Sequence, residues 1–356
     1  MAVTIVVLWI ACALAALALV QSACVWMDKR KYPPPGRMWK VPHESAAENN
    51  SSQQNTTCLH ALKLGEKSPA VVLEAGIGTS SLNWTLLQPR VAAFAATYSY
   101  DRAGLGWSDS DSRKCSVGAI VEDLHELLRI MELPAPYILV GHSFGGYIVR
   151  LYAQRFPDEV AGVVMVDPLT PEEWVAPDNA QKRLLQKASR IARVMSVFAF
   201  FGVVRFCFWA LHRGSNATSG RVVGLFGAGA ASVAQRVETE INKLPQPVIQ
   251  IVRMQWSRPK PFRTLAKYLD ELPACAKEVA ACSIPANLPV TVISGNQQPA
   301  VRVSEHAAIA KHSLRGTHIL AGKSGHWIQF DEPELIVNAI REMKAICDMN
   351  SVRGTG

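Results

Sequence analysis

The sequence carries few of the signs of a metal site, a nucleic-acid-binding surface or a repeat protein. Its eight cysteines form no C-x-x-C pair and no spacing typical of a zinc site. The net charge is +8, but the lysines and arginines are mostly scattered, and aromatic residues do not interleave with them as in nucleic-acid-binding stretches. No internal repeat stands out. The sequence therefore predicts no metal, no nucleic-acid partner and no solenoid.

The length and the cysteines leave two questions open. A chain of 356 residues can form one large α/β domain with an insertion, or two modest domains. Cys275 and Cys282 lie close enough in sequence to form a disulfide, and Cys58 with Cys115 is another conceivable pair. Buried free thiols are the alternative, and we prefer it.

The first twenty residues, Met1 to Val20, are apolar almost throughout. As a helix, about twenty residues span about 30 Å, the thickness of a bilayer core. Because no basic stretch precedes this run, we predict an uncleaved signal anchor over residues 1–23, with a cleaved signal peptide as the alternative. Residues 24–63 contain a proline-rich and a polar run, so we expect a linker there and a folded domain that starts near Leu64.

The sequence does not fix the side of the membrane on which this domain lies. Lys29–Lys31 directly follow the apolar run, and by the positive-inside rule they would hold the domain in the cytosol. N-x-[ST] sequons would instead suit a lumenal or extracellular domain. They lie at Asn49, Asn50, Asn55, Asn83 and Asn216. In either case, a basic face beside membrane lipid is the use of the net charge that we favour.

The stretch from Tyr137 to Arg150 predicts a strand, a sharp turn and a helix, with a serine at the turn. A β-rich run leads into Gly141-His-Ser-Phe-Gly145, and apolar residues at helical spacing follow. Side chains at Gly141 and Gly145 would collide where the strand and the helix close on each other. We expect Ser143 to expose its hydroxyl in a strained conformation, and the N–H of Phe144 to be free to donate to an oxyanion.

A second oxyanion donor is expected in the glycine-rich turn that follows an earlier strand. Ala70–Glu74 is predicted to be a buried strand, and Gly76-Ile-Gly78 comes directly after it. Such a turn can aim backbone N–H groups into a cavity, so we assign the N–H of Ile77 as the second donor. An ordinary strand–loop turn is the alternative.

Four motifs resemble, in their order and spacing, those of the α/β-hydrolase fold serine hydrolases. They are Leu73-Glu-Ala-Gly-Ile-Gly78, Tyr100-Asp-Arg-Ala-Gly-Leu-Gly-Trp-Ser-Asp109, Gly141-His-Ser-Phe-Gly-Gly146 and Ser324-Gly-His326. The resemblance covers residues 65–168 and 286–346. It implies a mostly parallel central sheet flanked by helices, a nucleophile at Ser143 and a base at His326, in the loop after the last strand. It also implies that Asp101 and Arg102 are mainly structural and that His142 shapes the turn rather than transferring protons.

The remaining pattern fits this architecture. Apolar spacing predicts helices and strands at 119–131, 160–166, 288–295, 307–311, 317–321 and 332–346. The resemblance implies a core in two parts, 64–168 and 286–349, with a helical lid over residues 169–285 between them.

One stretch of this expected lid, residues 194–211, is unusually apolar and aromatic. Arg190 and Arg193 precede it and Arg205 interrupts it. We prefer the interpretation that it packs over an apolar acyl pocket. A lid helix that dips into the membrane is the second interpretation. A second full span is disfavoured by Arg205 and by Gly202 near its centre.

The acid that should orient the histidine is not where many relatives carry it. In them a G-x-x-D pattern follows the strand predicted at 289–294, but this chain has Gly295-Asn-Gln-Gln298. We predict Asp167 as the acid, because some relatives draw it from the end of the strand after the nucleophile helix. Orientation of the histidine by Gln298 or Asn296 is the alternative. An amide in place of the carboxylate can cost about 10⁴ in kcat by fixing the wrong tautomer.

Together these expectations predict a membrane-anchored serine hydrolase that acts without a metal or an organic cofactor. Ser143 would form an acyl-enzyme, with His326 as base and then acid. The apolar lid and the anchor favour a small-molecule or lipid ester with an apolar acyl chain. The alternatives are thioester, C–C bond or peptide cleavage on the same scaffold, and a non-catalytic member that binds a hydrophobic ligand. Halide or epoxide displacement by a carboxylate is disfavoured, because the turn carries Ser143 and not aspartate. The sequence does not indicate the oligomeric state.

Overall fold

The computed structural model describes residues 1–43, 56–213 and 228–353. The chain divides into two compact units, and each is described by itself. The core unit comprises residues 35–186 and 267–356, and the helical unit comprises residues 1–34 and 187–266.

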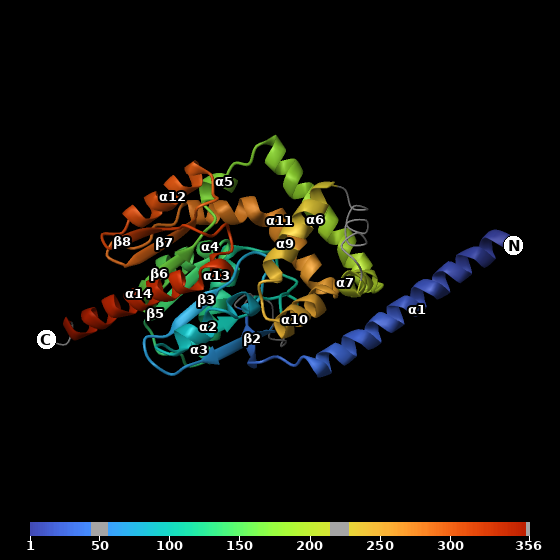
Figure 1. Cartoon of the computed structure of the whole chain (residues 1–356), viewed down its shortest axis with the longest axis horizontal. Helices are drawn as coiled ribbons and strands as arrows, with labels where there is room; N and C mark the ends of the chain where they lie inside the picture. The colour runs from blue at the N-terminus through green and yellow to red at the C-terminus, as the bar shows by residue number, and fades with distance from the viewer. Residues whose placement is uncertain (44–55, 214–227, 354–356) are drawn as a thin grey trace, which may run out of the picture. The chain divides into compact units, whose positions relative to one another are not determined.

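The core unit is built on an eight-stranded sheet in the order β1-β2-β4-β3-β5-β6-β7-β8 (Figure 1). The strands are β1 (Arg37–Pro42), β2 (Thr56–Leu64), β3 (Val71–Glu74), β4 (Thr97–Tyr100), β5 (Tyr137–His142), β6 (Val160–Val166), β7 (Val290–Gly295) and β8 (Gly316–Ala321). β2 pairs antiparallel with both of its neighbours, and every pair from β4 to β8 is parallel. The prediction of a mostly parallel sheet is therefore confirmed.

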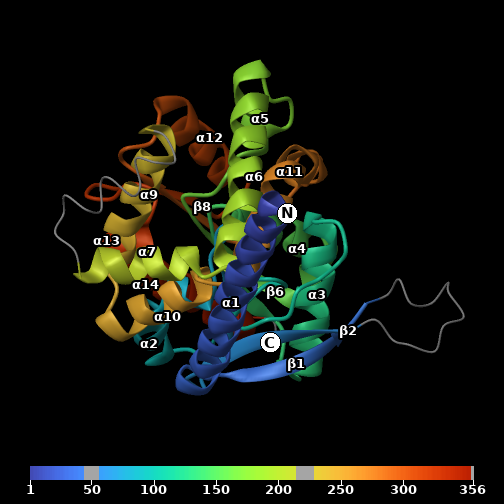
Figure 2. The ribbon, with the colours of Figure 1, turned by 90° about the vertical axis from the view of Figure 1, so that its right-hand side faces the viewer.

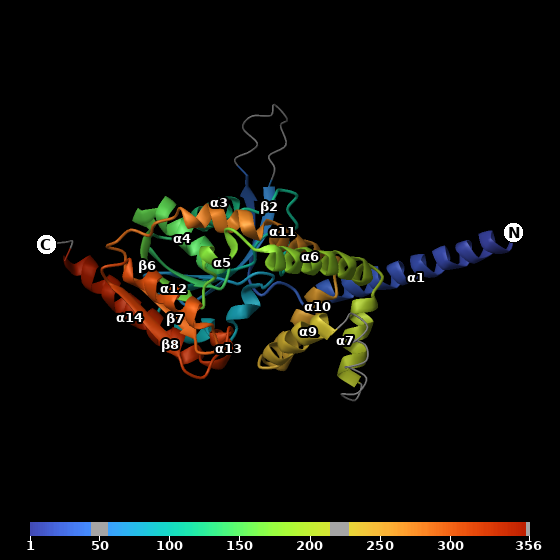
Figure 3. The same ribbon diagram turned by 90° about the horizontal axis from the view of Figure 1, so that it is seen from above.

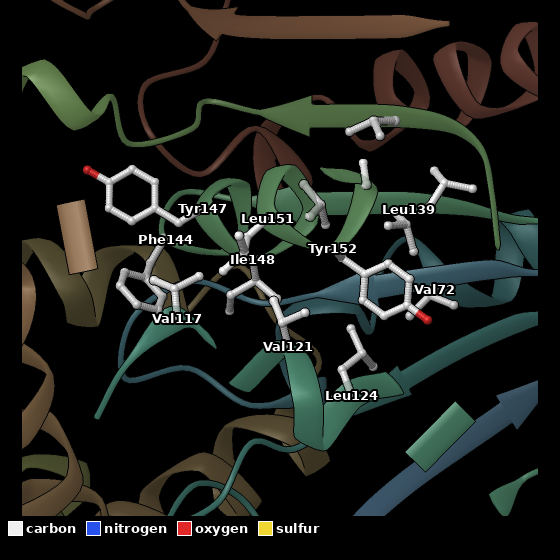
Figure 4. Packing of buried hydrophobic residues seen from close by; sticks show 14 of the residues in the cluster. Val72, Val117, Val121, Leu124, Leu139, Phe144, Tyr147, Ile148, Leu151 and Tyr152 are labelled. Atoms are coloured by element: carbon white, nitrogen blue, oxygen red, sulfur yellow. The ribbon is translucent and has the colours of Figure 1, made fainter. Parts of the chain in front are cut away.

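Helices cover both faces of this sheet, because the central strands are apolar on both sides. In β5, for example, Leu139 belongs to one buried cluster and Ile138 to the other. Figure 4 shows the first cluster, between the sheet and the helices α3 and α4. Parallel strands buried on both faces have nearly continuous apolar sequences, which is why they were recognisable. The helices of the core unit are α2 (Gln88–Ala92), α3 (Val117–Ile130), α4 (Gly145–Arg155), α5 (Pro171–Trp174), α12 (Ala300–Lys311), α13 (Ile328–Asp331) and α14 (Pro333–Arg353), with the short 3₁₀ helices η2 (Ser81–Trp84) and η3 (Pro157–Glu159). The start of α6 (Asn179–Phe200) and the end of α11 (Pro259–Ala280) also belong to this unit.

The prediction of a linker over residues 24–63 is wrong for the residues that the structure describes there. The first helix continues to Lys31, and β1 and β2 form the antiparallel edge of the sheet. The sequence pattern of β2 was hidden by His60, a polar residue that is fully buried because its ring bonds a buried carboxylate. The polar run 44–55 lies outside the described residues.

Of the five asparagines in glycosylation sequons, the described residues include only Asn83. Asn83 lies in η2, is 5% exposed, and accepts a hydrogen bond of 3.1 Å from Gln329. A glycan needs an exposed asparagine, so this sequon does not favour a lumenal domain. Asn49, Asn50, Asn55 and Asn216 lie outside the described residues.

The two disulfides considered from the sequence are not formed, and all eight cysteines are free thiols. The side chain that lies next to Cys275 is that of Cys115, and a hydrogen bond between the two thiols, together with burial, raises the pKa of Cys275.

Asp101, at the end of β4, holds the loop that follows this strand. Its carboxylate accepts hydrogen bonds from the backbone N–H of Ser81 at 2.7 Å and of Trp107 at 2.9 Å, and it bonds the ring of His60 at 3.0 Å. Burial alone would raise the pKa of Asp101, but the bonds from His60 and the two N–H groups outweigh it and lower the pKa. These contacts agree with the structural part that the resemblance implied for this motif.

The helical unit holds α1 (Ala2–Lys31) and helices from the middle of the chain, which Figures 2 and 3 show from two sides. They are the end of α6 (Asn179–Phe200), α7 (Val203–Arg213), α9 (Ala228–Ile241), α10 (Gln246–Trp256) and the start of α11 (Pro259–Ala280). Among the described residues, α1 is the one single helix that is long and apolar enough to cross a membrane, with a mean hydropathy of 2.8 and 0% of that window buried. By length and composition it is a candidate anchor, and a signal sequence would pass the same test.

We predict that Gly106→Ala destabilises the core unit by more than about 2 kcal/mol. Gly106 has φ +47°, and a Cβ there would lie 2.6 Å from Oδ1 of Asp101, inside the buried network. Gly322→Ala is the matched control, because a Cβ at that position meets nothing within 4 Å. Thermal unfolding monitored by circular dichroism compares the two variants. Equal melting temperatures of the two variants would contradict a structural role for the loop after β4 that Asp101 holds.

Candidate active site

Ser143 lies at the sharp turn between β5 and α4, in the strained conformation that the sequence predicts. Its φ is +55°, a region that non-glycine residues rarely adopt. A Cβ on Gly141 would lie 2.6 Å from the carbonyl oxygen of Gly145, and one on Gly145 would lie 2.5 Å from that of Glu74. Both glycines are therefore required by the close approach of strand and helix, as predicted.

His326 and Asp167 meet Ser143 at the carboxyl ends of the parallel strands. Nε2 of His326 lies 3.0 Å from Oγ of Ser143, and Nδ1 lies 2.6 Å from Oδ2 of Asp167. The three residues come from the turn after β5, the end of β6 and the loop after β8. Ligand-binding and catalytic groups of open parallel sheets gather at this edge. The structure thus brings together the serine, the histidine and the carboxylate that the sequence analysis selected.

The environment of Asp167 keeps its carboxylate ionised and fixed. Oδ1 accepts a hydrogen bond of 3.0 Å from the N–H of Gly295, and Oδ2 accepts one from the side-chain amide of Gln298. Burial alone would raise the pKa of Asp167, but the hydrogen bond and charge of His326 and the N–H of Gly295 outweigh it and lower the pKa below its usual value. An ionised partner is what an imidazolium next to Ser143 would need.

Gln298 occupies the position after β7 where the resemblance led us to look for the acid. The alternative prediction made it the group that orients His326, but its amide donates to Asp167 and not to the histidine. Oε1 of Gln298 accepts a hydrogen bond of 2.9 Å from Arg302, which in turn pairs with Glu173 at 2.6 Å. In the sequence, the signal for the contact between Gln298 and Asp167 was an amide side chain at the position where many relatives carry the acid.

His142, next to the serine, binds the backbone of the histidine loop. Its Nε2 lies 2.9 Å from the carbonyl oxygen of His326. Burial, with the nearby charge of His326, lowers the pKa of His142 to about 3, so the ring is neutral at physiological pH. Because a carbonyl only accepts, Nε2 must carry the hydrogen. The ring therefore helps to fix the loop that carries His326, a contact that the sequence did not reveal.

The glycine-rich turn after β3 lies directly against Ser143. A Cβ on Gly76 would be 3.4 Å from Cβ of Ser143. The guanidinium of Arg102 donates to the carbonyl oxygens of Ala75, at 3.0 Å, and of Gly76. The C=O of Gly76 and the N–H of Ile77 belong to one trans peptide group and point in opposite directions. Arg102 therefore turns the N–H of Ile77 away from itself.

Arg102 is held between acidic and aromatic groups. Its guanidinium pairs with Glu74 at 3.0 Å, and burial raises the pKa of Glu74 against the opposing charge of Arg102. The rings of Phe144 and Tyr268 lie 5.4 and 5.2 Å from its Cζ. Arg102 thus contacts the carbonyl oxygen of Gly76, the residue before the predicted donor Ile77, and the ring of Phe144, the other predicted donor. The resemblance had indicated only a structural part for Arg102.

The site has no arrangement suited to a metal. Within residues 1–43, 56–213 and 228–353, no group of three or more His, Cys, Asp or Glu side chains could hold a metal ion.

Comparisons with known proteins identify the family. The sequence matches the alpha/beta hydrolase fold family over residues 69–333, so the chain belongs to this family. Protein YqjL of Bacillus subtilis (strain 168) is 35% identical over 104 residues, which cover 29% of this chain and 41% of YqjL. The match thus spans less than half of that relative.

Solved structures agree with the fold. A thermophilic esterase from Thermogutta terrifontis is similar with a TM-score of 0.58 and 19% identity, covering 87% of this chain and 99% of the esterase. The epoxide hydrolase CorEH has a TM-score of 0.58 and 14% identity, covering 87% and 98%. At these identities the similarity shows the fold alone.

We predict that Arg102→Met lowers kcat by about tenfold or more while changing KM little, because small misplacements of an oxyanion donor are costly. kcat should be expressed per active site titrated with a fluorophosphonate, so that unfolded enzyme does not count. Arg150→Met is the matched control, since Arg150 is a second arginine of the core unit, half-buried, and its Nε and one terminal nitrogen are buried without a hydrogen-bond partner. A fall in titrated sites with unchanged kcat would show that Arg102 only stabilises the fold.

Proposed function

We propose that this protein is a serine hydrolase that cleaves carboxylic esters through an acyl-enzyme on Ser143, and that α1 anchors it to a membrane. One observation carries the proposal: Ser143, His326 and Asp167 form a continuous hydrogen-bonded chain, with successive distances of 3.0 and 2.6 Å. A serine hydroxyl is a weak nucleophile by itself, and this arrangement is the one that activates it.

In the proposed mechanism, Oγ of Ser143 attacks the ester carbonyl while Nε2 of His326 takes its proton. The carboxylate of Asp167 stabilises the imidazolium and fixes the tautomer of the ring. The N–H groups of Phe144 and Ile77 bind the oxyanion; that of Phe144 is available because the first N–H groups of a helix have no intrahelical acceptor. His326 then donates the proton to the leaving alkoxide, and water attacks the acyl-enzyme in the second half.

The contacts of the carboxylate argue against displacement chemistry of the epoxide or halide kind. That chemistry needs a carboxylate as the nucleophile, and the turn carries Ser143 instead. The carboxylate of Asp167 already accepts bonds from His326, Gly295 and Gln298, so it is placed to orient the histidine. The similarity in fold to CorEH therefore does not imply that this chain acts on epoxides.

The membrane anchor and the apolar acyl chain of the substrate are proposed from the helical unit. The long apolar helix α1 supports the anchor. Large apolar side chains on α6 and α7, among them Phe200 and Phe206, are exposed. An enzyme with such surfaces is suited to esters that partition into lipid.

We predict that a fluorophosphonate probe labels the wild-type protein and fails to label Ser143→Ala. His326→Ala and Asp167→Asn should lower the rate of labelling steeply, the latter by about 10⁴ as found when a triad carboxylate becomes an amide. Gln298→Ala should have a smaller effect, because the bond from Gly295 to Asp167 remains. Absence of label in the wild type would favour a non-catalytic member of the family. Full labelling of Asp167→Asn would reject Asp167 as the acid but keep the nucleophile.

We also predict that kcat/KM for p-nitrophenyl esters rises with acyl chain length, as each buried CH₂ contributes about 0.8 kcal/mol. The measurement uses the full-length protein in detergent micelles, with Ser143→Ala as the blank. A preference for acetate over longer chains would contradict the apolar substrate. Turnover of thioesters or peptides, without turnover of esters, would change the proposed substrate class but leave the acyl-enzyme mechanism in place.

A further inference from the structure

Gln21 is the one buried residue of α1, and it joins α1 to the other helices of the helical unit. Its side chain is 4% exposed, whereas the apolar window of α1 is 0% buried. Nε2 of Gln21 donates to the carbonyl oxygens of Ala199 at 3.0 Å and Ser257 at 2.7 Å. Oε1 accepts from Nε of Arg205 at 2.8 Å. The amide therefore uses both donors and its acceptor, and it ties α1 to the end of α6, the start of α7 and the residue after α10.

Arg205 extends this contact along α1. Its second nitrogen pairs with Asp28 at 2.6 Å, about two helical turns beyond Gln21 on the same face of α1. Gly202, in the turn between α6 and α7, has φ +78° and lies so close that a Cβ on it would be 3.4 Å from Oε1 of Gln21. We call Gln21, Asp28 and Arg205 the anchor clamp. It fixes the first turn of α7 to α1 at two levels.

An apolar surface lies on the same two helices that the clamp holds. Its side chains are between 38% and 62% exposed, and the rings of Phe206 and Trp209 are stacked with centroids 5.7 Å apart. We call this surface the α6–α7 patch. It consists of Val194, Val197, Phe200, Val203, Phe206 and Trp209. On each helix these side chains recur every three residues and so share one face, and exposed apolar faces mark interaction sites in water-soluble domains.

We propose that the α6–α7 patch is inserted in the bilayer beside α1 and that the anchor clamp holds it there. The proposal rests on the membrane anchor of the proposed function and adds a second membrane contact to it. α6 and α7 meet at 87°, and α7 has only 11 residues, so the pair enters one leaflet and does not span. Figure 3 shows α7 turning away from α6 beside α1.

The position and charge of the patch identify the bilayer as its occupant. The clamp begins at Gln21, where the exposed apolar run of α1 ends, so α7 starts at the level at which α1 would leave the lipid. Tryptophan, here Trp209, is typical of membrane interfaces. The exposed basic residues Lys29–Lys31, in the last turn of α1, complement anionic headgroups beyond the end of its apolar run.

Photo-crosslinking to lipid tests the patch. The full-length protein is reconstituted in phosphatidylcholine–phosphatidylserine vesicles that contain an alkyne-tagged phosphatidylcholine, with benzoylphenylalanine at position 206 or 209. Leu17 of α1 is the reference within the anchor, and Val301 of α12 is an exposed apolar control in the core unit. We expect lipid adducts at 206 and 209 as at 17, and none at 301. Adducts at 17 without adducts at 206 and 209, or adducts to a second protein chain, would overturn the proposal.

A second set of variants tests the clamp. Arg205→Gln and Asp28→Asn should each reduce the lipid adduct at 206 towards the level of position 301, while the adduct at 17 persists. Arg190→Gln is the control, because it removes a positive charge from α6 without touching the clamp. Fluorophosphonate labelling of Ser143 shows that each variant is folded. An adduct at 206 that neither variant reduces would overturn the clamp, whereas absence of the adduct at 17 would overturn the membrane anchor itself.

Discussion

The central interaction of the core unit is the contact of 3.0 Å between Oγ of Ser143 and Nε2 of His326. The sheet, the turn at Ser143 and the loop of His326 all contribute to holding these two atoms together. The two residues are 183 positions apart, and each sits on a loop beyond the end of a parallel strand. The serine is held in a strained backbone conformation by the close packing of β5 on α4 and by the hydrogen bond of 3.0 Å from its N–H to the carbonyl oxygen of Val166. The histidine loop is fixed from both sides, by the carboxylate of Asp167 and by the ring of His142. The sheet thus serves to align strand ends to within hydrogen-bonding distance.

Parts of this arrangement could be predicted from the sequence because they leave a local signature. The buried strands β5 and β6 are continuous apolar runs, and the turn at Ser143 needs glycine on both sides, so the elements and the nucleophile were recognisable. Asp167 was predicted from the family resemblance, because some relatives take the acid from the end of this strand and the position directly after β7 holds no carboxylate. The edge strands β1 and β2 were missed, because their signal is weak where polar residues such as His60 are buried by long-range bonds.

Other contacts could not be predicted because they join backbone atoms to side chains far away in the sequence. Arg102 binds the carbonyl oxygens of the turn at Gly76, and His142 binds the carbonyl oxygen of His326. Neither contact has a residue-type signature at the accepting end, since every residue carries a carbonyl group. The same holds for Gln21, whose amide donates to the backbone carbonyls of Ala199, in α6, and of Ser257, the residue after α10. A glutamine near the end of an apolar run gives no hint of these partners.

Gln298 in the core unit and Gln21 in the helical unit use the same chemical device. Each amide accepts a hydrogen bond from an arginine, Arg302 or Arg205, and that arginine pairs with a carboxylate. An amide is neutral but has both donors and an acceptor, so it can extend a charged network into a buried region without adding a charge that needs a counter-ion. At Gln298 this lets a single ionised carboxylate, Asp167, serve the histidine. At Gln21 it lets a helix that is apolar over its first twenty residues be joined firmly to a charged partner, so the polar contact falls where the apolar run ends and not within it.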